Sequence, residues 1–251
     1  MEAWSYEPVS APESASARMR RFPRDPDMTV YAIRTASQLV VRALLRGYNR
    51  FEVRGGENLP AHGSFVMVCN HSSHLDAVCL TASLPIARVH RAFPAAAADY
   101  FFSTVPRSIF SIVVINGLPF DREHDSAGSL DTCRRLLAQP GNVLILFPEG
   151  TRSPSGALGR FRSGVGRLVA GTATPVVPCH LAGAHEAWPK GAVLPRPRTL
   201  SLRIGHPRVF LDMRADDRAA AAAIGARLRD DVLALANNET SHANAPLSET
   251  G

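Results

Sequence analysis

Short apolar runs alternate with segments of helical character over most of the chain. The runs that suit buried strands lie at 64–69 (SFVMVC), 143–147 (VLILF), 176–177 and 200–204. The segments that suit helices lie at 73–84, 163–170 and 215–236. Short apolar strands that alternate with helices are typical of a mostly parallel sheet whose faces are covered by helices. The pattern therefore predicts an α/β fold with such a sheet at its centre.

A separate helical pattern lies near the N-terminus, at residues 28–50. Its apolar positions recur at helical spacing and are Val30, Ile33, Val40, Leu44 and Tyr48. Its polar, mostly basic positions recur every four residues and are Arg34, Gln38, Arg42, Arg46 and Arg50. The two stripes predict an amphipathic helix with a cationic face. Such a helix can lie in a membrane interface with its arginines on anionic headgroups, or it can cover the core of its own domain.

The remaining segments complete the expected organisation. Residues 1–27 are rich in Pro, Ser, Ala and charge, and we expect a disordered leader there. The segment 28–50 is expected to be the amphipathic interfacial helix, 51–236 the main domain, and 237–251 a disordered polar tail. We expect no signal peptide and no spanning helix, because no apolar stretch reaches the roughly 20 residues that a membrane crossing requires.

Composition narrows the class of protein. The chain has 251 residues, 45% of them apolar and 20% charged, which suits one globular domain with a substantial core. The net charge of +6 favours anionic partners. Only 7% of residues are aromatic and no nucleic-acid-binding motif is present, so we expect no nucleic-acid partner. The four cysteines are scattered, which argues against a disulfide framework or a zinc site.

The segment NHSSHLDA, at 70–77, follows the first strand-like run directly. His71 and Asp76 are five residues apart, so a turn that leads into a helix can bring their side chains together. The carboxylate can then orient the imidazole and leave its other nitrogen free to take a proton from a hydroxyl. The spacing therefore indicates a His–carboxylate dyad.

Three other interpretations of this segment remain open. Ser72 or Ser73 can simply cap the start of a helix. His71, His74 and Asp76 can be metal ligands, although no further ligand pair accompanies them. Ser72, Ser73 or Cys69 can be a nucleophile, although the Gly-x-Ser-x-Gly elbow is missing.

A second polar segment, FPEGTRS, follows the strand-like run VLILF. It places Glu149, Gly150, Thr151 and Arg152 at the carboxyl end of a buried strand. Gly150 permits close backbone approach, and Arg152 can bind a phosphate with both arms of its guanidinium. Arg122, in the segment NGLPFDR, is a further candidate for phosphate binding.

Taken together, these segments resemble the glycerolipid acyltransferases of the lysophosphatidic acid acyltransferase type. NHSSHLD is similar to the His-x4-Asp motif of that family, FPEGTRS to its third block, and VVPC (176–179) to its fourth. The second block departs from the family pattern, because Gly117 is one residue closer to Arg122 than in the family and Asn116 stands where Gly is usual. The resemblance covers roughly residues 60–210.

The resemblance implies a role for each matching residue. His71 would be the general base and Asp76 its orienting partner. The acceptor would be bound by Asn70, Arg122, Glu149, Gly150, Thr151 and Arg152, and Pro178 would shape the acyl or acceptor pocket. No metal, cofactor or covalent acyl-enzyme would take part.

The resemblance also implies partners and a location. The donor would be acyl-CoA or acyl carrier protein, and the acceptor a lysophospholipid such as 1-acylglycerol-3-phosphate. The protein would contact the cytoplasmic face of the cell membrane in a peripheral or monotopic manner. Other acceptors such as a glycolipid, a hydrolase that transfers the acyl group to water, and a non-enzymatic lipid-binding protein are the alternatives.

Overall fold

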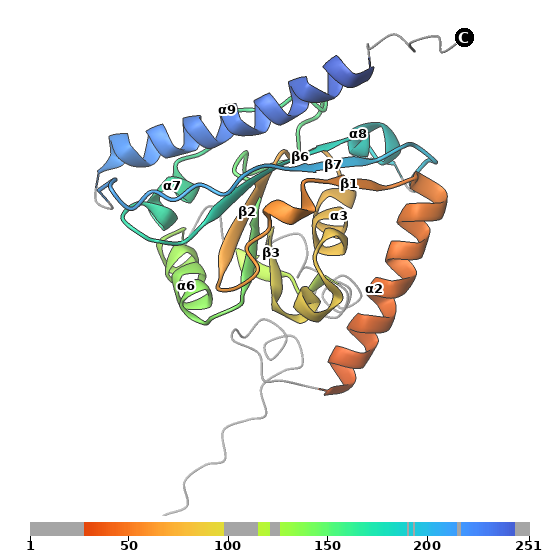
Figure 1. The fold of residues 1–251 in the computed structure, drawn as a ribbon, viewed down its shortest axis with the longest axis horizontal. Helices are drawn as coiled ribbons and strands as arrows, with labels where there is room; N and C mark the ends of the chain where they lie inside the picture. Colours follow the sequence, from red (N-terminus) through yellow and green to blue (C-terminus); the bar gives the residue numbers. More distant parts are fainter. Residues whose placement is uncertain are drawn as a thin grey trace, which may run out of the picture.

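The computed structural model describes residues 28–97, 115–120, 126–189, 191–192, 194–214 and 217–243. The expected leader at 1–27 and the candidate residue Arg122 lie outside the described residues. Seven strands form one sheet in the order β1-β7-β6-β2-β5-β3-β4 (Figure 1). Their bounds are β1 Glu52–Arg54, β2 Phe65–Cys69, β3 Ala92–Ala97, β4 Leu118–Phe120, β5 Val143–Leu146, β6 Val176–Ala182 and β7 Ser201–Ile204.

The sheet is mostly parallel, as predicted. Strands β2 to β6 all run in the same direction, and β7 pairs antiparallel with β6. At the edge, β1 pairs parallel with β7. The central strand β2 is buried along its whole length, because it has a neighbour on each side and helices on each face.

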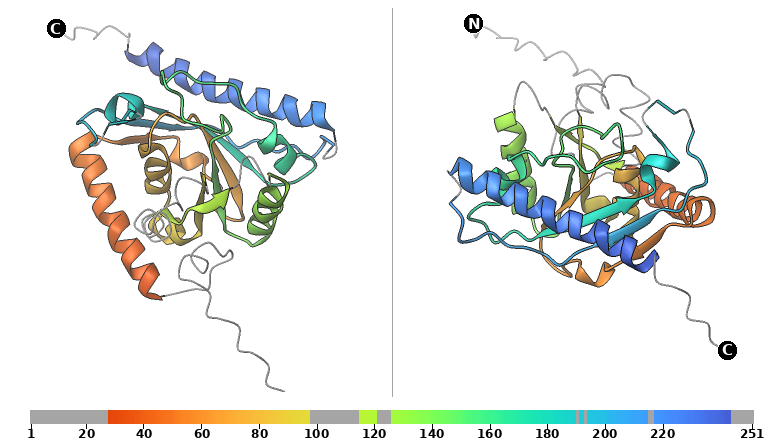
Figure 2. Two further views of the ribbon diagram at one scale, coloured as in Figure 1. Left: turned by 180° about the vertical axis from the view of Figure 1, so that it is seen from behind. Right: turned by 90° about the horizontal axis from the view of Figure 1, so that it is seen from above.

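Helices cover both faces of the sheet (Figure 2). Their bounds are α2 Met28–Asn49, α3 Leu75–Ser83, α6 Ser126–Ala138, α7 Gly164–Val169, α8 Ala184–Ala187 and α9 Arg218–Ala243, with 3-10 turns η1 Gly56–Asn58 and η2 Ile86–Arg91. Alternate side chains of β2 enter opposite cores. Phe65, Met67 and Cys69 pack with α2, α3 and α8, whereas Val66 and Val68 pack with α6, α7 and α9.

The predicted elements are confirmed, with differences at the ends of the chain. The C-terminal helix α9 begins at Arg218 and runs to Ala243, so it passes the boundary at 237 where a disordered tail was expected to begin. The sequence analysis did not predict β1, β3, β4 or α6. Strands β1 and β4 have only three residues each, too few to show an alternating pattern.

The N-terminal helix α2 has the predicted bounds, but its faces are reversed. Arg34 and Gln38 are only 3% and 1% exposed, because the polar stripe faces the domain. Arg42 Nη2 donates to the carbonyl of Leu84 at 2.6 Å. The apolar stripe faces outward instead, with Val40 and Leu44 about 60% exposed. The expectation that the whole arginine stripe lies on anionic headgroups is therefore wrong, since Arg34 and Arg42 contact the protein.

Burial on this inward face of α2 lowers the pKa of the Arg34 guanidinium to about 10. The ring of Tyr31 stacks on His90 of η2, with centroids 4.4 Å apart.

No helix within the described ranges has the length and apolar character needed to cross a membrane.

Candidate active site

The predicted dyad forms at the carboxyl end of β2. His71 lies in the turn after the strand, and Asp76 lies in the first turn of α3. The Nδ1 atom of His71 is 2.8 Å from Oδ2 of Asp76. The other ring nitrogen, Nε2, has no hydrogen-bond partner among the described residues, and 16% of the His71 side chain is exposed. The imidazole is therefore held on one side and accessible on the other.

Asp76 is held as firmly as it holds His71. Its side chain is fully buried. Oδ2 also accepts the backbone N–H groups of Ser72 at 2.7 Å and Ser73 at 2.9 Å. Three N–H donors thus converge on one oxygen, at the N-terminus of a helix. An acceptor at Nδ1 holds the proton of a neutral imidazole on that atom, which leaves Nε2 as the basic atom.

Glu149 joins this turn to the loop after β5. Oε1 accepts the backbone N–H of His71 at 2.8 Å, and Oε2 accepts that of Gly159 at 3.0 Å. A third link runs from the N–H of Ser153 to the carbonyl of His71 at 2.8 Å. Burial raises the pKa of Glu149, although the two N–H donors act in the opposite direction. Glu149 thus fixes the backbone on which the imidazole is mounted.

The ring of Phe147 packs against one face of the imidazole. It stacks on His71 with centroids 4.3 Å apart and an interplanar angle of 18°. Sequence reasoning placed Phe147 at the end of an apolar strand and at the start of FPEGTRS but gave it no role, and it gave no signal for Gly159. A Cβ at Gly159 would lie 2.7 Å from Oε2 of Glu149, so only glycine permits the observed approach.

The segment FPEGTRS reaches the dyad as predicted. Gly150 has φ of 78°, and a Cβ there would lie 2.6 Å from Nε of Arg162. Thr151 is exposed and Arg152 is partly buried, directly before the serine that bonds to His71. The roles of Gly150, Thr151 and Arg152 in substrate binding stay predictions.

Asn70 and Pro178 lie in or directly after the central strands. Asn70 is 5% exposed, and its side-chain amide donates to the carbonyl of Leu181 at 2.9 Å and accepts its N–H at 2.8 Å, which ties β2 to β6. Pro178 is buried within β6, opposite Val68, and its carbonyl accepts the N–H of Gly205. These contacts are with the protein itself, and the expected roles of both residues in substrate binding stay predictions.

The alternative nucleophiles are poorly placed. Cys69 is fully buried, and burial raises the pKa of its thiol well above the ordinary value. Ser73 is also fully buried, and its hydroxyl donates to the carbonyl of Trp188 at 2.9 Å.

The ring of His74, a candidate metal ligand, lies edge-on to the ring of Trp188. No cluster of three or more His, Cys, Asp or Glu side chains suited to a metal occurs in the described part of the chain.

Comparison with known proteins decides the family. The Acyltransferase family model matches residues 50–182, which include both polar segments of the site. This chain belongs to the Acyltransferase family. Its Acyltransferase region is similar to that of 1-acyl-sn-glycerol-3-phosphate acyltransferases from Cocos nucifera and Limnanthes alba. The identities are 29% over 144 residues and 28% over 154 residues, or 57% and 61% of this chain.

The same comparisons show how far the likeness extends. The matched regions are 45% and 52% of those relatives, so this chain spans about half their length. The fold is that of the 1-acyl-sn-glycerophosphate acyltransferase PlsC from Thermotoga maritima. The TM-score is 0.63 at 23% identity, and the match covers 91% of this chain and 86% of that one.

Proposed function

We propose that this acyltransferase moves a fatty acyl group from a thioester donor to the hydroxyl of a lysophospholipid such as 1-acylglycerol-3-phosphate. The observation that carries the proposal is the 2.8 Å contact of His71 Nδ1 with the buried Asp76, which leaves Nε2 open. The names of the similar plant proteins support the class of acceptor.

In the proposed reaction, Nε2 of His71 removes the proton of the acceptor hydroxyl as its oxygen attacks the thioester carbonyl. The new C–O bond forms, the C–S bond breaks, and the leaving thiolate receives the proton from the imidazolium. Asp76 stabilises that imidazolium while it exists. General base catalysis contributes typically about 10²–10⁴-fold, and the positioning of two substrates on one site contributes the rest.

An apolar pocket beside the dyad suits the acyl chain. It has a volume of about 250 Å³ and is lined by Leu130, Leu146, Val165 and Leu168, together with Phe147. Phe147 also stacks on His71, so one residue of the pocket wall contacts the proposed general base. We assign it to the hydrocarbon nearest the thioester or the acceptor ester.

A basic groove beside Glu149 suits the anionic part of the donor. It encloses about 1060 Å³ between the loop at 160–163 and helix α9. Its arginines are Arg134, Arg160, Arg162, Arg167, Arg218 and Arg229. Both donors fit this charge, because CoA carries phosphates and acyl carrier protein carries acidic side chains. The charge of the groove therefore supports either acyl-CoA or acyl carrier protein as the donor, and an experiment with both donors distinguishes them.

We also propose that the protein works on a membrane surface, at the cytoplasmic face, and that α2 contacts the lipid. Its outward face carries Ile33, Leu39, Val40 and Leu44, all about half exposed or more. The exposed Arg50 follows the last residue of α2, at one end of this face, where phosphate headgroups would lie. A lipid acceptor needs such a surface, because its acyl chain stays in the membrane.

The decisive experiment measures acyl transfer by purified protein with vesicles, radiolabelled acyl-CoA or acyl carrier protein, and lysophosphatidic acid. We expect labelled phosphatidic acid with at least one donor. His71→Ala should lower the rate about 10²–10⁴-fold, and Asp76→Asn should lower it by less, because the imidazole remains. Near-normal turnover by His71→Ala would contradict the mechanism. Labelled free fatty acid as the main product would indicate a hydrolase, and product only from a glycolipid would change the acceptor.

A further inference from the structure

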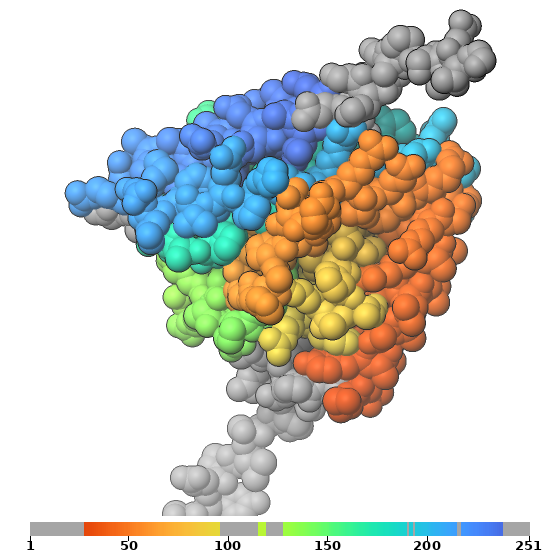
Figure 3. All heavy atoms as spheres, in the orientation of Figure 1, coloured from red at the N-terminus to blue at the C-terminus, as the bar shows by residue number. Residues whose placement is uncertain are grey.

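A second pocket lies at the opposite end of β2 from the dyad. It has a volume of about 540 Å³ and is lined by Phe65, the first residue of β2, whereas His71 follows the last residue of that strand. The strand alone spans roughly 15 Å. The segments that form the pocket, coloured red, orange and yellow, meet on the face shown in Figure 3. None of its lining residues belongs to the candidate active site.

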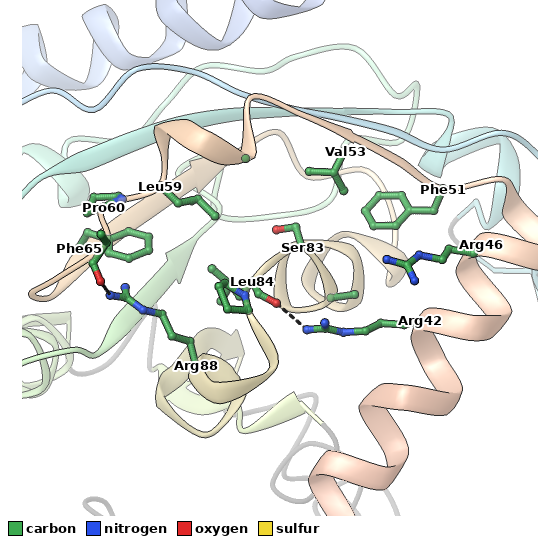
Figure 4. Close-up of a pocket in the computed structure, with 14 residues that line it drawn as sticks. Arg42, Arg46, Phe51, Val53, Leu59, Pro60, Phe65, Ser83, Leu84 and Arg88 are labelled. Carbon is green, nitrogen blue, oxygen red and sulfur yellow. Dashed lines mark hydrogen bonds between the residues drawn. The ribbon is translucent and has the colours of Figure 1, made fainter.

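Three arginines and no acidic residue line this pocket. Arg42 and Arg46 extend from α2, one helical turn apart, and Arg88 extends from η2 (Figure 4). Residues four apart on a helix are neighbours, so Arg42 and Arg46 can reach one ligand together. The pocket therefore concentrates positive charge that no lining residue balances.

Arg42 and Arg88 are held in place by the protein. Arg42 donates Nη2 to the carbonyl of Leu84, and Arg88 donates Nη2 to that of Ala61. The buried Nε of Arg42 and Nη1 of Arg88 have no hydrogen-bond partner among the described residues. Burial lowers the pKa of Arg42, and the nearby charge of Arg46 lowers it further. An anion between Arg42 and Arg46 would offset this repulsion.

Apart from Ser83, the side chains of the rest of the wall are apolar. Phe51, Val53, Leu59, Pro60 and Leu84 line it (Figure 4). Its volume lies within the range of about 300–1,000 Å³ that is usual for small-molecule sites, so the pocket has room for more than a bare anion. The ligand that matches it has an anionic end and an apolar body.

We propose that this pocket binds a phosphate group carried by a partly apolar molecule, with the phosphate on Arg42 and Arg46 and the body against the apolar wall. Phosphate matches the planar fork of guanidinium and can accept bonds from two arginines at once. A membrane phospholipid and a soluble phosphate ester both have this chemistry. The site is separate from the dyad, so the proposal does not depend on the acyl transfer proposed above.

Hydrogen–deuterium exchange of the whole protein tests the site. The probes are inorganic phosphate, phosphatidylcholine vesicles, and the same vesicles with phosphatidic acid, all at one ionic strength. The peptides to follow cover 51–61 and 82–91, which contribute to the pocket without belonging to α2. Arg46→Gln is the test variant, since Arg46 is exposed and we expect its replacement to leave the fold intact. Arg227→Gln, at an exposed position of α9, is the charge-matched control.

We expect phosphate-bearing probes to protect these peptides in the wild type and in Arg227→Gln. In Arg46→Gln the probe concentration that gives half-maximal protection should rise about tenfold or more, as expected for the loss of a charge-assisted hydrogen bond. Protection by inorganic phosphate would show that a soluble phosphate group is sufficient, and protection only by phosphatidic acid vesicles would identify a lipid headgroup. Absence of protection with every probe, or equal protection in Arg46→Gln, would overturn the proposal.

Discussion

At the scale of single residues, Glu149 is as important to the site as the dyad itself. Its two oxygens hold the backbone of His71 and of Gly159, which belong to different loops. The family resemblance suggested a contact with substrate, but both oxygens are occupied by the protein. We therefore propose that Glu149 acts through His71, by positioning the backbone of the residue proposed as the general base.

We predict that Glu149→Gln destabilises the protein and slows turnover together. One side-chain oxygen becomes an NH₂ group, which cannot accept a hydrogen bond and leaves one backbone N–H unpaired. The expected loss is about 1–3 kcal/mol in the free energy of unfolding, measured by urea denaturation. Because the His71 backbone loses its anchor, kcat should fall more than the KM for either substrate changes.

The control for this variant is Glu186→Gln, at an exposed position of α8. It should change neither stability nor kcat. If Glu149→Gln lost stability but kept kcat at a temperature where it is folded, Glu149 would be structural only.

The residues of the dyad could be predicted from spacing, because a turn followed by a helix start admits few arrangements of His71 and Asp76. The surroundings could not be predicted in the same way. Phe147 has the sequence signature of any buried strand residue, and its stacking on His71 depends on how β5 and β2 align. The bonds of Asn70 to Leu181 likewise depend on two strands that are 111 residues apart in the chain.

At the scale of elements, helix α2 shows the limit of periodicity. The two stripes predicted an amphipathic helix, and the helix is there. Periodicity cannot say which stripe faces the domain when a polar side chain finds its partner in a backbone carbonyl. Here Arg42 donates to the carbonyl of Leu84, Thr35 beside the stripe bonds to the ring of His90, and the apolar stripe faces outward.

We predict that this outward stripe drives binding to lipid. Val40→Gln with Leu44→Gln should weaken the partition of the protein onto phospholipid vesicles about tenfold or more, since burial of each apolar side chain contributes roughly 1.5–3 kcal/mol at most. Vesicle sedimentation measures the change. The double variant Val209→Gln with Leu211→Gln is the matched control, because those side chains are as exposed but lie outside α2. Equal partition of both variants would place the lipid contact elsewhere.

At the scale of the whole molecule, the C-terminal helix α9 closes one face of the sheet by very close packing on α7 (Figure 1). A Cβ at Gly166 of α7 would lie 2.0 Å from the backbone oxygen of Ala221 in α9. No side-chain movement relieves a clash with backbone, so the two helices would have to separate.

We predict that Gly166→Ala lowers the free energy of unfolding by about 1–3 kcal/mol, as overpacking does. Gly164→Ala is the control on the same helix, because its added Cβ would meet nothing within 4 Å. Thermal unfolding of both variants compares them directly. Similar melting temperatures for the two would show that α9 adjusts its position without loss of stability.

The edge of the sheet joins the two ends of the domain, and this has a consequence for synthesis on the ribosome. Asn49, which ends α2, bonds to the carbonyls of Arg196 and Arg198, 147 and 149 residues later. In the described sheet β1 pairs with β7 alone. At roughly 5–20 residues per second, a nascent chain needs on the order of ten seconds to make those partners. The partners α3 and η2 of the helix are made early, but during that interval the C-terminal end of α2 lacks the segment that will hold it. A lipid surface is therefore available to this end of the helix before the edge of its own sheet is.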